Sequence, residues 1–478
     1  MVRSTIVSRS VDVHGPDNFP TGCASSPDGT CVLTATASDG EFRIYDTPRR
    51  CLEGDEGEGG EGEDAAADVP EEARASLVSR QGGPPPSSSS ASYAWYPLMS
   101  SASPLTSVFA TARGHSAPIH LVDAHTSALR ASYRPHNAVD ELEGPTVVEF
   151  GPDGRRIYGT GFRTDRTIAV FDVAIPGRDG MIARLGKTRR SADGQKGIPS
   201  ALSFPKFPRD GGGGPSNVFA VGTYAPASIY IYDDRMSSDF DPAGTIVLHG
   251  GLAVVGHGRA FSRKKRRFAR VDGDGDDGED VDDLFASARV NWFQSRARGG
   301  VTQLAWAPPH SDNPHLLFSA SRRSDAVLSW DVRALSGLDP RDGRKHRPVC
   351  GLRSYARGGA GTNQRLQFDV DGDGRRIFVG SGEDGDGAVR IYDVKGGSLE
   401  GSVDVGCGDD AVNGVSFFDL PGNGAEGGKR YGILSVAVGS RRFPNIDTDE
   451  EDAVETDDGR ARVPGFIQFH TLKEFSNE

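Results

Sequence analysis

Two stretches of the sequence begin like ligand-binding motifs, and each lacks a residue that its chemistry requires. Residues 186–188 read Gly-Lys-Thr, as at the end of a phosphate-binding loop, but Met181 stands where the first glycine of that loop belongs. Alternating aspartates in 369–374 start like a calcium loop, whereas Gly380 occupies the position of the bidentate glutamate. The motifs Gly-x-Ser-x-Gly and His-Glu-x-x-His do not occur in the sequence. We therefore predict no catalytic site, no metal and no cofactor, and we do not expect an enzyme.

The residues that best fit a binding function are arginines in the segments between β-type runs. Guanidinium groups contact phosphates, and nearby aromatic side chains stack on unpaired bases, which suits single-stranded RNA. The predicted RNA-binding residues are Arg134, His136, Arg163, Arg166, Arg322, Arg323, Gln364, Arg365, Arg441, Arg442 and Phe443. The alternative is that these arginines only form surface ion pairs with carboxylates such as Asp165, Asp325 or Glu383. The sequence leaves both interpretations open.

A basic run stands apart from these loops. It consists of Lys264, Lys265, Arg266 and Arg267, and an aspartate- and glycine-rich stretch follows closely. Such a run in an accessible segment is typical of a nuclear import signal or of a non-specific RNA-binding patch. The alternative is a solvated charge run that the following acidic residues neutralise. We favour nuclear import.

A strand that ends in aspartate recurs along the chain and indicates the scaffold of these loops. It occurs at 42–46, 119–123, 168–172, 229–233, 327–331, 389–393 and 466–470, with histidine in the place of the aspartate in the last. Two shorter β-type runs precede each occurrence, often joined by a tight turn, as at 26–29, 151–154 and 371–374. This order is typical of one WD-repeat blade, and unrelated β-sandwich strands are the alternative. We predict an all-β, seven-bladed WD-repeat β-propeller over residues 1–478, with Trp330 packed between blades.

In a propeller, the loop between the second and third strands opens on the same face as the connection to the next blade. The predicted RNA-binding arginines fall in these two kinds of segment, as does Arg113, so we expect them to share one face. The spacing also predicts insertions, because the terminal aspartates Asp46 and Asp123 are 77 residues apart and a repeat needs about 40–45. We expect disordered acidic insertions at about 49–92, 252–298 and 445–462, since their composition cannot bury enough apolar surface to fold.

The net charge of −13 seems to speak against a nucleic-acid partner, but it averages unlike segments. Residues 53–72, 272–283 and 447–458 together hold 26 acidic residues and no basic one. Excluding those 26 charges turns the net charge from −13 to +13. We therefore expect a basic propeller, with the acidity confined to the insertions.

The five cysteines are widely spaced, odd in number and without a Cys-x-x-Cys pair. This pattern favours neither a disulfide framework nor a zinc site. The N-terminal residues lack the apolar stretch of a signal peptide, and no apolar run approaches the roughly 20 residues that span a bilayer. We expect a soluble protein of a reducing compartment.

Several segments resemble one WD-repeat family more closely than WD repeats in general. They lie at 18–19, 22–23, 93–101 (Tyr-Ala-Trp-Tyr-Pro-Leu-Met-Ser-Ser), 129–134, 140–142, 176–179, 362–365, 413–416 and 442–444. Together and in this order they resemble the telomerase Cajal body protein family. Arg134, Gln364, Arg365, Arg442 and Phe443 combine a match to this pattern with a place on the arginine-rich face.

The resemblance implies a non-enzymatic RNA-binding scaffold in the Cajal bodies of the nucleus. It implies recognition of the CAB-box loop of H/ACA-type small Cajal body RNAs and, in animals, of telomerase RNA. The implied partners are H/ACA ribonucleoprotein and telomerase components, with no membrane and no small-molecule substrate. The alternative is a WD-repeat protein–protein adaptor that binds acidic peptides and no RNA.

Overall fold

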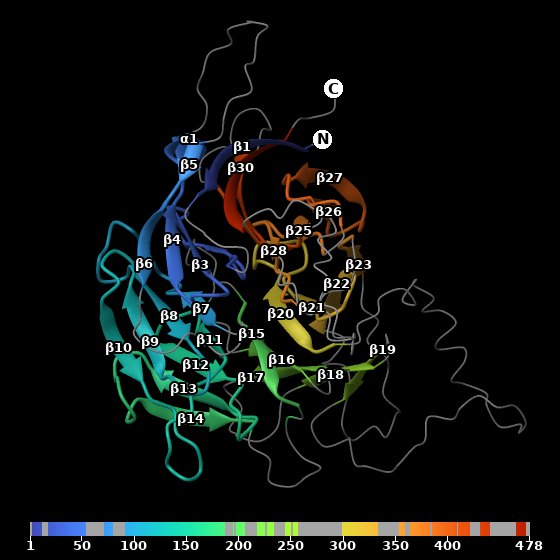
Figure 1. The fold of residues 1–478 in the computed structure, drawn as a ribbon. Helices are drawn as coiled ribbons and strands as arrows, with labels where there is room; N and C mark the ends of the chain where they lie inside the picture. Colours follow the sequence, from blue (N-terminus) through green and yellow to red (C-terminus); the bar gives the residue numbers. More distant parts are fainter. Residues whose placement is uncertain are drawn as a thin grey trace, which may run out of the picture.

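Seven β-sheets lie around a common centre in the computed structural model of the chain (Figure 1). The structure describes residues 2–11, 18–53, 71–79, 91–186, 195, 197–205, 218–224, 227–233, 244–249, 252–256, 299–332, 353–358, 364–382, 385–408, 410–420, 431–439 and 465–474. With one exception in the last sheet, neighbouring strands pair antiparallel, and the seven sheets are the blades of a propeller. The predicted all-β fold with seven blades is confirmed.

The first four blades follow one another along the chain. Blade 1 contains β2 (Ala24–Ser25), β3 (Cys31–Ala35), β4 (Phe42–Asp46) and β6 (Ala75–Ser79). Blade 2 contains β7 (Ser92–Trp95), β8 (Val108–Ala112), β9 (Ile119–Asp123) and β10 (Leu129–Tyr133). Blade 3 contains β11 (Val147–Phe150), β12 (Arg156–Thr160), β13 (Ile168–Asp172) and β14 (Met181–Leu185). Blade 4 contains β15 (Pro199–Ser203), β16 (Val218–Thr223), β17 (Ser228–Asp233), β18 (Gly244–His249) and β19 (Leu252–Gly256).

The last three blades complete the ring. Blade 5 contains β20 (Val301–Trp306), β21 (Leu316–Ser321), β22 (Ala326–Asp331) and β23 (Arg353–Ala356). Blade 6 contains β24 (Phe368–Val370), β25 (Arg376–Gly380), β26 (Ala388–Asp393) and β27 (Leu399–Asp404). Blade 7 contains β28 (Val412–Asp419), β29 (Tyr431–Val438), β30 (Phe466–Glu474), β1 (Val2–Ser10) and β5 (Glu71–Ala73). All seven strands predicted from their terminal aspartate or histidine are the third strands of these blades.

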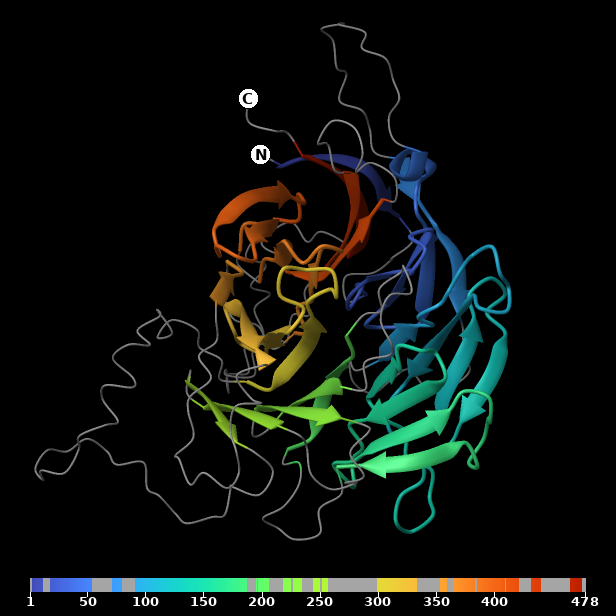
Figure 2. The ribbon, with the colours of Figure 1, turned by 180° about the vertical axis from the view of Figure 1, so that it is seen from behind.

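Blade 7 joins the two ends of the chain. The N-terminal strand β1 pairs antiparallel with β30, and β5 adds to β1 in parallel. The Ser10 hydroxyl also accepts a hydrogen bond from the amide of Ile467 at 2.8 Å. Figures 1 and 2 show β1 and β30 side by side in this blade. Because strands from the two ends form one sheet, the ring closes through backbone hydrogen bonds.

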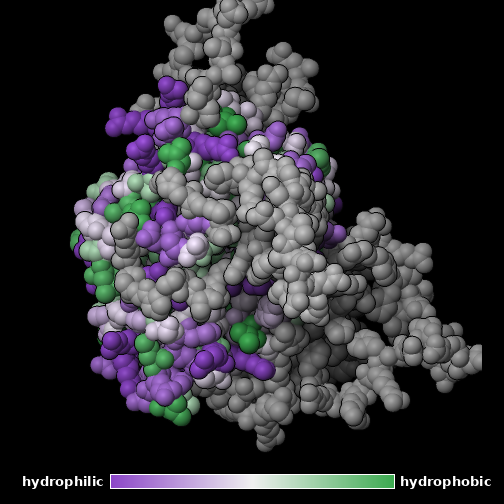
Figure 3. Space-filling view, viewed as in Figure 1, coloured by the Kyte–Doolittle hydropathy of each residue, from purple (hydrophilic) through white to green (hydrophobic). Residues whose placement is uncertain are grey.

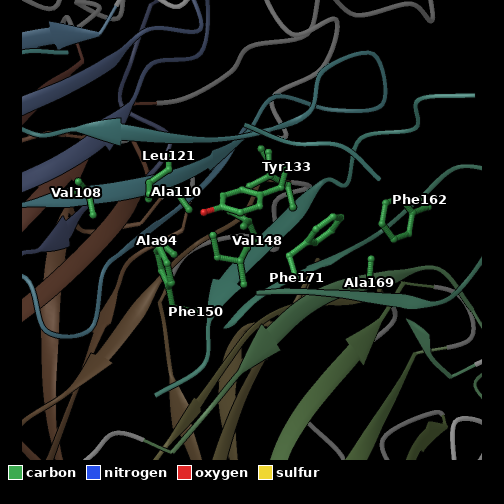
Figure 4. Close-up of a cluster of buried hydrophobic side chains, with 13 residues drawn as sticks. Ala94, Val108, Ala110, Leu121, Tyr133, Val148, Phe150, Phe162, Ala169 and Phe171 are labelled. Atoms are coloured by element: carbon green, nitrogen blue, oxygen red, sulfur yellow. The ribbon is translucent and has the colours of Figure 1, made fainter. Parts of the chain in front are cut away.

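The core consists of apolar layers between neighbouring blades. Trp330 is fully buried in a cluster built from blades 4 and 5, and its indole N–H donates to the Ser319 hydroxyl at 2.8 Å. The predicted position of this tryptophan is therefore confirmed. Between blades 2 and 3, the rings of Tyr133 and Phe171 pack with centroids 5.8 Å apart (Figure 4). Such aromatic residues contribute much of the buried apolar area that holds blade to blade.

The tight turns within the blades form where the sequence predicted them. The amide of Gly29 donates to the Ser26 carbonyl at 2.9 Å, and Gly154 and Gly374 close equivalent turns. The aspartates that resemble a calcium loop serve this turn and its surroundings. A carboxylate oxygen of Asp371 accepts hydrogen bonds from the amides of Arg375 and Arg376. The alternation of aspartates thus has a structural explanation.

The predicted boundaries of two insertions are wrong. Within 49–92 the chain forms helix α1 (Arg49–Glu53) and the strands β5 and β6, and β6 is the outer strand of blade 1. The repeat pattern ends at the terminal aspartate of the third strand, so it does not mark the fourth strand that follows. Similarly, β19 lies within 252–298 and pairs with β18. The stretches 54–70, 80–90, 257–298 and 445–462 lie outside the described residues.

Candidate nucleic-acid interface

A cavity of about 250 Å³ lies on the axis of the ring. Apart from Arg322, its walls come from the innermost strand of each blade or from residues near that strand in the sequence. The lining residues are Phe19, Thr21, Ala24, Ala91, Ser92, Tyr93, Val147, Val148, Glu149, Ser200, Ala201, Leu202, Thr302, Gln303, Leu304, Arg322, Gln364, Arg365, Leu366, Gln367 and Asn413. Three of the eleven predicted RNA-binding residues, Arg322, Gln364 and Arg365, are among them. The fold therefore brings together residues that lie more than 40 positions apart in the sequence.

Arg365 enters the cavity from the connection between blades 5 and 6. Burial, reinforced by the positive charge of Arg322, lowers the pKa of its guanidinium to about 10. The group therefore stays charged at neutral pH, although its surroundings solvate it poorly. Among the described residues, no carboxylate forms an ion pair with Arg365. A negatively charged ligand group in the cavity would offset both the desolvation of Arg365 and its repulsion from Arg322.

Arg322 follows β21 directly and reaches the same cavity. Its amide donates to the Gly300 carbonyl at 2.9 Å, which fixes the start of the loop in blade 5. Its guanidinium lies over the ring of Tyr224, 5.3 Å from the ring centroid. The next residue, Arg323, is exposed and has a φ of 55°. With this backbone conformation the side chain of Arg322 lines the cavity, whereas that of Arg323 does not.

The other polar residues of the cavity mainly hold the backbone in place. The Gln303 amide both donates to and accepts from the backbone of Phe368, at 2.8 and 2.9 Å. The side chain of Gln367 accepts from the amide of Cys23 at 2.8 Å and so links blade 6 to blade 1. Glu149 is the one carboxylate among the described lining residues, against two arginines. The cavity therefore carries a net positive charge.

Four other predicted residues gather between blades 2 and 3, away from the lining of the cavity. Arg134 is exposed at the end of β10, where its amide donates to the Gly177 carbonyl at 3.0 Å. His136 is half-buried, and its carbonyl accepts a hydrogen bond from Arg184. Arg163 and Arg166 are exposed in the loop between β12 and β13. Figure 3 shows hydrophilic side chains interspersed with apolar ones over the described part of one face.

Within the described residues, neither Asp165 nor Asp325 forms an ion pair with a predicted RNA-binding arginine. Asp165 pairs with Arg184 from β14, and it accepts hydrogen bonds from the amide and hydroxyl of Thr167. Arg163 and Arg166 form no ion pair with a carboxylate in the described parts of the chain. Asp325 forms no such pair there either, while Glu383 lies outside the described residues.

The remaining predictions fall where the structure gives no description. Arg441, Arg442 and Phe443 lie outside the described residues, as do the basic residues Lys264, Lys265, Arg266 and Arg267. For these positions the RNA-binding and nuclear-import assignments remain predictions.

Known proteins are similar in sequence to one repeat of this chain and to most of its length. Residues 8–46 match the WD40 family, described as WD domain, G-beta repeat. Telomerase Cajal body protein 1 from Bos taurus is 30% identical over 387 residues, and that from Homo sapiens is 30% identical over 388 residues. These alignments cover 80% and 81% of this chain and 52% of each relative. The Drosophila melanogaster homologue is 25% identical over 382 residues, which are 79% of this chain and 51% of that protein.

The chain is therefore similar to the telomerase Cajal body proteins over about four fifths of its length. It spans about half the length of the curated relatives that it matches. The family resemblance drawn from the sequence is confirmed. Of the five residues that combined the family pattern with the arginine-rich face, Gln364 and Arg365 line the cavity and Arg134 lies at the rim between blades 2 and 3.

Sequence reasoning missed one buried arginine beside the cavity. Arg357 is only 2% exposed, and burial lowers its pKa to about 10. Its guanidinium donates to the Leu366 carbonyl at 2.9 Å and to the Gly380 carbonyl at 3.4 Å. It thereby holds the backbone next to Arg365. No periodicity marks it, because it directly follows the outer strand of blade 5.

Arg113, in the equivalent loop of blade 2, has a structural role instead. Its guanidinium donates to the Gly40 carbonyl at 2.8 Å and lies over the ring of Phe42 in blade 1. Across the described ranges, no three metal-ligating side chains cluster closely enough to hold a metal ion. Nor does the part of the chain that the structure describes contain a helix long and apolar enough to cross a membrane.

Proposed function

We propose that this protein is a non-enzymatic scaffold that binds RNA at the axial cavity and the loops around it. The observation that carries the proposal is the pair Arg322 and Arg365. Two guanidinium groups share a partly dehydrated cavity, and neither forms an ion pair with a described carboxylate. A phosphate between them would supply the missing negative charge, with charge-assisted hydrogen bonds to both.

The rim between blades 2 and 3 extends this surface. Arg134, Arg163 and Arg166 are exposed there, and they form no ion pairs with described carboxylates. A single-stranded loop of RNA offers a phosphate at every nucleotide, so several separated arginines can each contact one. His136 lies two residues after Arg134, and Arg323 directly follows Arg322; both belong to the same proposed interface.

The RNA that we propose is the CAB-box loop of H/ACA-type small Cajal body RNAs, together with telomerase RNA where the organism uses this route. The name of the relatives from Bos taurus and Homo sapiens refers to telomerase and to the Cajal body. On that basis we propose that this chain acts in the nucleus, in Cajal bodies. Its proposed partners are H/ACA ribonucleoprotein and telomerase components.

Crosslinking the full chain to RNA in cells, followed by sequencing of the bound RNA, tests this proposal. We expect enrichment of H/ACA-type RNAs, and a strong decrease of that enrichment for the double variant Arg322→Gln, Arg365→Gln. Arg155→Gln is the matched control, because Arg155 is exposed in the turn between β11 and β12 and therefore faces the opposite side of the ring.

Recovery of no H/ACA-type RNA above background would contradict the proposal. If acidic peptides were instead recovered in an arginine-dependent manner, the rival function would hold, namely a WD-repeat adaptor between proteins. Both functions need the same positive charge, so the identity of the bound molecule decides between them.

A further inference from the structure

An exposed aromatic residue lies against Arg322, one of the two arginines of the cavity. Tyr224 follows β16 in blade 4, and 46% of its surface is exposed. Most other aromatic side chains of the described blades are buried between sheets. Hydrophobic packing therefore does not account for this ring, which lies at the edge of a positively charged cavity.

The surroundings of Tyr224 hold its backbone firmly. Its amide donates to the Ile198 carbonyl at 2.8 Å, which ties the loop of blade 4 to the connection from blade 3. Gly300 packs so closely that a Cβ atom there would lie 2.4 Å from the Tyr224 Cα atom and 2.5 Å from its Cδ2 atom. Ile198 is itself 48% exposed. A fixed ring with an exposed aliphatic neighbour is a preorganised apolar platform.

Arg322 connects this platform to the cavity. Its guanidinium lies 5.3 Å from the centroid of the Tyr224 ring, and its side chain lines the cavity together with Arg365. An aromatic ring that contacts one of two neighbouring cations matches the two parts of a nucleotide, namely a flat base and a charged phosphate. A free phosphate or an acidic peptide would use the arginines and leave the ring uncovered.

We propose that Tyr224 and Ile198 form a stacking platform for one unpaired base of the bound RNA, whose phosphate lies between Arg322 and Arg365. This inference rests on the proposed function and adds to it a defined nucleotide position. Tyr224 acts through stacking, so it contributes affinity without charge. Arg322 contributes both charge and the positioning of the ring.

Anisotropy titrations of the full chain with a fluorescein-labelled H/ACA-type hairpin RNA test this assignment. Stacking of one base on an aromatic side chain contributes enough that Tyr224→Ala should weaken binding by about five-fold to a hundred-fold. Tyr224→Phe keeps the ring and should bind like the wild type. The matched control is Leu399→Ala, because Leu399 is an exposed apolar residue on the outer strand of blade 6.

Two further measurements separate stacking from a structural role. The salt dependence of binding should be the same for Tyr224→Ala as for the wild type, whereas Arg365→Gln should lower its slope by about 0.7. In a set of hairpins with one abasic loop nucleotide each, one position should weaken binding to the wild type but not to Tyr224→Ala, since the two changes remove the same contact.

The outcomes distinguish this inference from the function on which it rests. If the wild type binds the hairpin and Tyr224→Ala binds equally well, or if every abasic position adds to the effect of Tyr224→Ala, the platform is refuted while RNA binding stands. If the wild type does not bind the hairpin, both proposals fail.

Discussion

The histidine that replaces aspartate in the last blade should make the closure of the ring sensitive to acid. His470 is 0% exposed in β30, between the N-terminal strand β1 and β29, and neither ring nitrogen has a hydrogen-bond partner among the described residues. Burial lowers its pKa to about 4, although the charge of Asp404 acts in the opposite direction. The imidazole is therefore buried in its neutral form.

The direction of the pH effect follows from this shift. In the unfolded chain the histidine has a pKa of about 6.5, so as the pH falls below that value the unfolded state takes up the proton first. Stability is therefore lost from about pH 6.5 down to about pH 4, and the full difference amounts to ~3 kcal/mol. At pH 5 the loss should already be ~2 kcal/mol.

The variant His470→Leu isolates this contribution. The free energy of unfolding, measured by urea denaturation between pH 7.5 and pH 4, should fall by ~3 kcal/mol less for the variant than for the wild type. At pH 7 the variant should be no less stable, because leucine removes two buried nitrogens without partners. Stability must be compared between the variant and the wild type, because Asp371 has the opposite pH dependence in both proteins. Burial raises the pKa of Asp371 to about 6, so its contribution to stability is lost as the pH rises. Parallel curves for the two proteins would refute the reasoning.

Three substitutions test the packing and closure of the ring, each by the urea midpoint at pH 7. Trp330→Ala removes a fully buried ring and should lower the free energy of unfolding by ~3–5 kcal/mol; a loss below ~1 kcal/mol would mean that blades 4 and 5 do not pack through it. Gly29→Ala should cost ~1–3 kcal/mol, because Gly29 has a φ of 75° and a Cβ atom would lie 2.2 Å from the ring of Phe418; an unchanged midpoint would contradict this turn geometry. Ser10→Ala leaves the buried amide of Ile467 without its partner and should cost ~1–3 kcal/mol; no loss would argue against closure through β1.

The repeat pattern made the number of blades predictable, whereas the outer strands were harder to find. Five of the seven third strands end in an aromatic residue and aspartate, and these strands are largely buried, so their sequence is distinctive. The outer strand β6 reads Ala-Ser-Leu-Val-Ser and follows an acidic stretch, and nothing local distinguishes it from a loop. The pairing of β1 with β30 joins residues more than 450 positions apart, which local periodicity cannot show.

Some residues of the candidate site could also be predicted from the sequence, whereas others could not. The rule that certain loops share one face identified Arg322 and Arg365 in advance, because it depends only on strand order. Arg357 and Tyr224 escaped notice, since their roles depend on burial and on neighbours from other blades. The prediction that Arg113 belongs with the binding arginines did not anticipate its hydrogen bond to Gly40 and its contact with blade 1. Charge and loop position can be read from sequence, while exposure requires the fold.

The affinity of the purified chain for an H/ACA-type hairpin RNA over a range of salt concentrations tests the central claim most directly. The double variant Arg322→Gln, Arg365→Gln should bind at least ten-fold more weakly than the wild type, because it removes two charge-assisted hydrogen-bonding groups. Its salt slope should also fall by about 1.4, or about 0.7 for each single-strand phosphate that is no longer neutralised. The control Arg155→Gln should keep both the affinity and the slope. Equal affinities and slopes for the wild type and the double variant would contradict RNA binding at the axial cavity.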